Sequence, residues 1–128
     1  MEVLEKTSIK NLMIDFKEKS FRRDGYILNI LGTEWTVKVV DELSNPDIDG
    51  LCCSYNKTIY LLHPKSYGAY SYDEEQYRFL LIARHEIIHA FVFESGFNSI
   101  EVGDEQTTDW LAYQFDKIKY VFDLLKTE

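Results

Sequence analysis

Two of the three histidines in this chain flank a glutamate in the segment A-R-H-E-I-I-H-A-F, residues 83–91. His85 and His89 are four residues apart, so on a helix their imidazoles lie one turn apart on the same face. At that separation two ring nitrogens can reach one Zn²⁺ at about 2.0–2.1 Å. Glu86 follows the first histidine, where its carboxylate can reach a water on the metal without binding the metal. The segment predicts a metal site. Its alternative is a hydrogen-bonded histidine pair at the edge of the core.

A catalytic zinc site needs a third protein ligand and an open fourth position. No histidine follows His89, which excludes designs with three histidine ligands. Glu105 and Asp109 stand four residues apart in the segment G-D-E-Q-T-T-D-W, residues 103–110. Glu105 can be the third ligand, and Asp109 can accept the free N–H of a ligating histidine and so fix its tautomer. The connection between His89 and Glu105 is long enough for one helix to end at Ser95-Gly96 and for the next to return.

These motifs resemble the gluzincin arrangement of zinc metallopeptidases, in which H-E-x-x-H precedes a helix bearing E-x-x-x-D. The short connection and the strand-rich first half are most similar to compact metallopeptidases of phages and mobile elements, the ImmA/IrrE type. The resemblance covers about residues 58–112. Many relatives have alanine soon after the glutamate, where this chain has Thr107 and Thr108. The resemblance implies a minimal zincin fold with one Zn²⁺ held by His85, His89 and Glu105, with Glu86 as the catalytic carboxylate and Asp109 as the orienting residue.

The activity implied by the resemblance is metal-assisted hydrolysis of a peptide bond in a protein or peptide substrate, with a repressor or regulator among the candidates. Zinc lowers the pKa of water toward ~7, and Glu86 takes its proton and later passes it to the leaving amine. The strand T-I-Y-L-L, residues 58–62, is either a sheet edge that pairs with an extended peptide or an ordinary core strand. An oxyanion-stabilising donor is also expected. Its candidates are Tyr67, Tyr70, Tyr72 and His63.

Two other functions compete with this one. A deformylase-like zinc amidohydrolase takes its third ligand from a cysteine upstream of the histidines, and Cys52 or Cys53 could have that place. The glycine-rich and glutamine-bearing segments that accompany such a cysteine are missing, so apolar packing is the better account of the two thiols. The other alternative is a metal-stabilised regulatory module that binds its partner without cutting it.

Composition and charge exclude several classes of function. The chain has 128 residues, of which 45% are hydrophobic, and a formal net charge of −8. This acidity argues against binding nucleic acid, which needs a basic surface. No segment has the ~20 apolar residues of a membrane span, and the acidic N-terminus is unlike a signal peptide. With two adjacent cysteines and no disulfide framework, we expect a reducing, intracellular setting. The resemblance to the ImmA/IrrE type implies that this is the cytoplasm of a bacterial or phage-infected cell.

The hydrophobic pattern predicts a single α+β domain over residues 1–128. An amphipathic helix is expected at about 3–20, followed by two strands around Gly32, a loop at 44–50 and a second hairpin that ends at residue 62. Ser71 and Glu74 form a capping-box pattern that opens a long, largely apolar helix at about 73–94, which should run through the middle of the domain. A last helix should begin at Asp104 and end near Leu125. Because the helices do not alternate with the strands, we expect a small antiparallel or mixed sheet.

Overall fold

The structure, a computed structural model, describes residues 7–96 and 105–125. Over these residues the fold is α+β, as predicted, with a five-stranded mixed sheet and three α-helices. The strands are β1 (Thr7–Ser8), β2 (Tyr26–Ile30), β3 (Thr33–Val40), β4 (Gly50–Cys53) and β5 (Thr58–Leu62). The α-helices are α1 (Leu12–Glu18), α2 (Tyr72–Glu94) and α4 (Glu105–Leu124), and two 3-10 helices are η1 (Ile9–Asn11) and η2 (Pro64–Ser66).

The sheet is built from the two predicted hairpins, which join through a parallel pair in the order β1-β2-β3-β5-β4. The first hairpin turns at Leu31 and Gly32, whose φ angles are 51° and 94°. A two-residue turn with both φ angles positive matches the right-handed twist of the strands that it joins. The second hairpin pairs β4 with β5, and β5 then lies parallel to β3.

This strand order decides between the two expectations for residues 58–62. Strand β5 has β3 on one side and β4 on the other, and its Ile59 and Leu61 are fully buried. The proposal that it forms a sheet edge was therefore wrong, and β5 is a core strand. Over the described residues, β4 is the edge strand on this side of the sheet.

The predicted N-terminal helix is wrong in its extent, and its residues 3–6 lie outside the described residues. Thr7 and Ser8 pair in parallel with β2, and Ser8 then caps η1 by accepting a hydrogen bond from the Lys10 amide. Helix α1 begins only at Leu12 and ends where Lys19 adopts a left-handed conformation with φ 58°. Its Phe16 packs against Phe79 of α2, with the ring centroids 5.1 Å apart.

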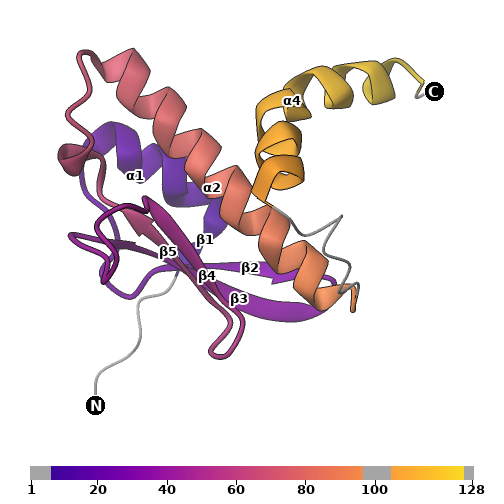
Figure 1. The fold of residues 1–128 in the computed structure, drawn as a ribbon, viewed down its shortest axis with the longest axis horizontal. Helices are drawn as coiled ribbons and strands as arrows, with labels where there is room; N and C mark the ends of the chain where they lie inside the picture. The colour runs from indigo at the N-terminus through magenta and orange to yellow at the C-terminus, as the bar shows by residue number, and fades with distance from the viewer. Residues whose placement is uncertain (1–6, 97–104, 126–128) are drawn as a thin grey trace.

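Helix α2 crosses one face of the sheet, and the first turns of α4 pack on the side of α2 that faces away from the sheet (Figure 1). The residues that α2 buries recur at helical spacing: Phe79, Ala83, Glu86 and Ala90. The predicted capping contact is present, because the Glu74 amide donates to Ser71 Oγ over 3.1 Å. In a capping box the Glu74 carboxylate would accept a hydrogen bond from the amide of Ser71, but here it accepts from the Tyr70 amide. Although α2 has apolar residues on most of its sides, some of them remain exposed where neither the sheet nor α4 covers the helix, as Phe91 and Phe93 do.

The last residue of α2 fastens this helix to the sheet. The Glu94 carboxylate accepts hydrogen bonds from Thr33 Oγ1 at 3.1 Å and Trp35 Nε1 at 3.0 Å. Lys57, in the turn between β4 and β5, forms an ion pair with it at 3.2 Å. Burial would raise the pKa of Glu94, but these hydrogen bonds hold it below its usual value. One carboxylate thus connects the helix with both hairpins.

Within the described part of the chain, none of the helices has the length and apolar character needed to cross a membrane.

Candidate metal centre

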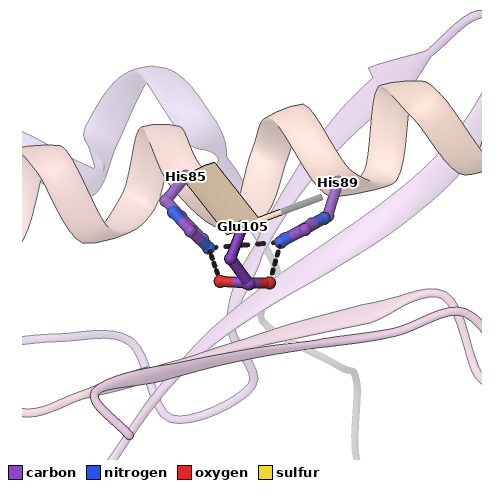
Figure 2. A group of neighbouring side chains, drawn as sticks. All are labelled: His85, His89 and Glu105. Carbon is purple, nitrogen blue, oxygen red and sulfur yellow. Dashed lines mark hydrogen bonds and ion pairs between the residues drawn. The ribbon is translucent and has the colours of Figure 1, made fainter. Parts of the chain in front are cut away.

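Helix α2 carries the H-E-I-I-H segment in its second half, and α4 returns so that its first turn lies beside it. One helical turn separates His85 from His89, and their Nε2 atoms are 3.2 Å apart. Glu105 is the first described residue of α4. Its Oε2 lies 2.8 Å from His85 Nε2 and its Oε1 lies 2.8 Å from His89 Nε2. The carboxylate therefore faces both imidazoles, as Figure 2 shows.

The donor set fits a divalent metal ion. Two ligand atoms of a tetrahedral Zn²⁺ at 2.0–2.1 Å are about 3.3–3.4 Å apart, which is close to the separation of the two imidazole nitrogens. A ligand atom from each of His85, His89 and Glu105 lies within 4.8 Å of the other two. Two imidazoles and a carboxylate also match the preference of zinc for nitrogen ligands with one oxygen. The predicted ligand residues therefore converge.

Asp109 has the predicted contact with a ligating histidine. Its Oδ1 lies 2.6 Å from His85 Nδ1. A carboxylate can only accept a hydrogen bond, so Nδ1 donates its proton to Asp109, and a neutral His85 ring would then present the lone pair of Nε2 to a metal ion. That nitrogen is the one that faces His89 and Glu105. A carboxylate that accepts from the outer N–H in this way fixes the tautomer of a metal ligand and raises its basicity.

Glu86 lies beside the ligands but is not one of the three converging residues. It is buried, and its Oε2 is 3.9 Å from His85 Nε2. Burial raises the pKa of Glu86 to about 7, an effect that the His85 ring opposes and the carboxylates of Glu105 and Asp109 reinforce. A carboxyl group with a pKa near neutrality can accept and return a proton at that pH.

Gly50 of β4 is a site residue that we did not predict. A Cβ atom added there would lie 2.9 Å from both Glu86 Cγ and Ile82 Cγ2, and 3.0 Å from Glu86 Oε2. A Cβ at these distances would force the side chains of Glu86 and Ile82 to shift, so only glycine lets β4 approach Glu86 this closely without displacing it. The sequence marked Gly50 as the end of a turn-rich loop, and this signal did not indicate contact with α2.

Two adjoining cavities lie along β4 on either side of Glu86. One, of about 430 Å³, is lined by Cys52, His89 and Phe93, and the other, of about 240 Å³, by Leu81, His85 and Asp109. They share Gly50, Glu86 and Glu105, so together they form one cleft that runs past the ligand cluster. We call it the β4 cleft. An extended segment could lie in it.

The backbone of β4 presents hydrogen-bonding groups toward its free side. The Leu62 amide donates to the Asp49 carbonyl over 2.8 Å, so these residues are a hydrogen-bonded pair of the antiparallel ladder. Such pairs alternate along the ladder. The N–H and C=O groups of Gly50 and Cys52 therefore point away from β5, and no described strand pairs with them.

The four candidate oxyanion donors are not among the residues that line the β4 cleft, and they have other contacts, so the structure gives no support for this role. Tyr67 donates its hydroxyl to the Leu62 carbonyl, and His63 Nδ1 accepts from the Lys65 amide. Tyr72 packs on Phe16, and Tyr70 is 97% exposed. All four lie in the loop that precedes α2 or directly beside it. The aromatic density of the loop gave no information about its distance from the histidines.

The cysteines are not part of the converging ligand group. Cys52 lines the cleft, and burial, with a smaller contribution from the charge of Glu86, raises the pKa of its thiol to about 12. A zinc ligand must be a thiolate, which this environment disfavours. Glu105 already has the place of a third ligand, so the arrangement argues against a deformylase-like site.

The chain matches no protein-family model, no curated protein and no solved structure.

Proposed function

We propose that this protein is a zinc-dependent peptidase of the gluzincin type that hydrolyses peptide bonds in an extended protein or peptide substrate. The observation that carries the proposal is the convergence of His85, His89 and Glu105, with the buried Glu86 beside them. Zn²⁺ bound by these residues would act as a Lewis acid on a carbonyl group and lower the pKa of a water molecule toward about 7.

Each residue of the cluster has a role in such a reaction. Glu86, buried with its Oε2 3.9 Å from His85 Nε2, would accept a proton at its carboxylate and return it to the leaving amine. His85, His89 and Glu105 would hold the metal, and Asp109 would keep His85 in the tautomer that presents Nε2. Because the ligands come from both α2 and α4, the packing of these helices determines whether the site assembles.

The free side of β4 supports a peptide as the substrate. An extended segment that adds to this strand would form hydrogen bonds with the backbone of Gly50 and Cys52. It would then lie in the β4 cleft, and its backbone would pass Glu86 and the ligand cluster. Backbone recognition of this kind selects an extended chain with little demand on its side chains, which suits a peptidase that acts on an unfolded segment.

The proposal is tested by incubating zinc-loaded protein with casein, an unfolded protein substrate, and with a mixture of extended peptides. Wild type and the matched control Glu42→Gln, at an exposed position outside the cleft, should cut. Glu86→Gln should bind zinc equally well and lose at least about a hundredfold in rate. Absence of cutting by zinc-loaded wild type on every substrate would reject the peptidase and favour a metal-stabilised module that binds a partner without cutting it.

A further inference from the structure

The second half of α4 exposes large apolar side chains that no described part of the chain covers. Phe115 is 48% exposed, Phe122 62% and Leu125 74%. In Figure 1 this part of the helix extends away from the sheet and from α2. A contiguous apolar patch on a protein surface normally marks an interaction surface. This segment therefore needs a covering partner.

Five apolar residues form one stripe along this helix, which we call the α4 stripe. Their spacing of four, three, four and three residues keeps them on one side of the helix, as in a helix-pairing heptad. The members of the α4 stripe are Leu111, Phe115, Ile118, Phe122 and Leu125.

Four of the five members of the α4 stripe are arranged symmetrically about residue 120, and only Leu111 has no counterpart. Phe115 and Leu125 are each five residues from that point, and Ile118 and Phe122 are each two residues from it. In two antiparallel helices related by a twofold axis there, Ile118 of each copy lies level with Phe122 of the other. Phe115 lies level with Leu125 in the same way. A surface that is complementary to itself under a twofold rotation is what an isologous dimer requires.

The surface next to Phe115 provides a place for the end of the second helix. A crevice of about 210 Å³ between α2 and α4 is lined by Arg84, Ile87, Ile88, Phe91 and Phe115. Phe91 is 43% exposed. Because Leu125 of one copy lies level with Phe115 of the other, it can reach this crevice. Stripe and crevice together offer on the order of 600 Å² of apolar surface per copy, close to the ~800 Å² of a standard interface.

Charge also favours a second copy as the occupant. Residues 111–125 contain two lysines and two aspartates, whereas the whole chain has a net charge of −8. Two acidic chains repel each other least where the contacting segments are neutral. A neutral segment also lacks the excess of lysine and arginine with which amphipathic helices bind anionic membranes.

A second apolar face of α4 is less suited to pairing with itself. Trp110, Tyr113, Val121 and Leu124 are more than half exposed there. These residues are arranged symmetrically about Lys117, so a twofold axis at that point would bring two ammonium groups together. Like charges opposed in an interface disfavour the complex. The α4 stripe has no charged residue at its centre.

From these observations we propose that two copies of this chain associate through antiparallel α4 stripes around a twofold axis near residue 120. Glu105 and Asp109 lie on the other side of α4 from the stripe, so the β4 cleft stays open in the dimer. The proposal does not depend on the metal or on any peptidase activity.

The test compares charge substitutions at two similarly exposed positions. Phe122 and Leu124 are 62% and 66% exposed, but they lie on nearly opposite sides of α4. The mass of the full chain is measured by analytical ultracentrifugation over about a hundredfold range of concentration, and thermal melting checks that each variant folds.

Wild type should dimerise. Phe122→Glu should weaken dimerisation by at least about a hundredfold, because the twofold axis places two unpaired carboxylates in the interface. Leu124→Glu should leave it unchanged.

Leu125→Glu provides a second variant on the α4 stripe and should act like Phe122→Glu. A wild type that stays monomeric at every concentration would overturn the proposal and leave the stripe to a different protein. A dimer that Leu124→Glu dissociates as strongly as Phe122→Glu would also overturn it, since the α4 stripe would then not be the interface.

Discussion

Replacing Glu86 with glutamine should stabilise the metal-free protein at high pH while abolishing catalysis. Burial raises the pKa of Glu86 from 4.5 to about 7 in the folded chain. The folded state therefore holds this proton more tightly than the unfolded state does. The stability that results is fully present below pH 4.5 and is lost as the pH rises toward 7. Above pH 7 the folded chain carries a buried carboxylate, whereas the variant carries an uncharged amide of nearly the same shape.

The size of the effect follows from the shift of about 2.5 pKa units between 4.5 and 7. At 1.36 kcal/mol per unit this is at most about 3–4 kcal/mol. Because the carboxylate borders the open β4 cleft, solvent screening reduces it to about 1–2 kcal/mol. The difference between Glu86→Gln and wild type should therefore be near zero at pH 4.5 and reach about 1–2 kcal/mol at pH 8.

The assay is urea unfolding of both proteins in the presence of a chelator at several pH values, with ΔG extrapolated to water. Taking the difference between the two proteins cancels the groups that titrate in both. Added zinc should shrink the difference, because a divalent cation stabilises the neighbouring carboxylate. A difference that stays constant between pH 4.5 and 8 would refute the reasoning that burial perturbs Glu86.

Three further substitutions probe the elements that position the site. Gly50→Ala should displace the Glu86 carboxylate and lower kcat about 10–100-fold with zinc affinity unchanged; an unaltered kcat would contradict this positioning role. Asp109→Asn should weaken zinc binding about 10–100-fold in a competition titration, because its amide no longer holds His85 in the required tautomer, and equal affinity would argue against this contact. Glu94→Ala should lower the melting temperature by several degrees, since three donors lose their acceptor, and an unchanged melting curve would show that α2 is held by other contacts.

The local patterns of the sequence predicted most elements because each has a strong local cause. The hairpin turn at Gly32 and the cap at Ser71 depend on backbone conformation and on neighbouring groups, so single residues reveal them. The spacing of His85 and His89 predicted a shared helix face for the same reason. The prediction for the N-terminal helix failed because Thr7 and Ser8 pair with β2, which is a tertiary contact that overrides the helical pattern.

Features that depend on the order of strands or on packing between elements could not be predicted from local patterns. The sequence of β5 is that of any buried strand, and only its pairing with both β3 and β4 shows that it is not an edge. The approach of Gly50 to Glu86 joins residues that are 36 positions apart, and nothing near Gly50 indicates it. The contact of Glu105 with both histidines depends on how α4 packs against α2. Its prediction rested on the motif and its spacing.

The proposed function depends most on whether one divalent ion is held by His85, His89 and Glu105. The direct measurement is the zinc content of purified protein after dialysis against zinc and then against metal-free buffer. Wild type and His63→Ala, a control at the histidine outside the cluster, should retain one zinc per chain, whereas His89→Ala and Glu105→Ala should lose it. Wild type that retains no zinc, or variants that retain as much as wild type, would contradict the metal centre.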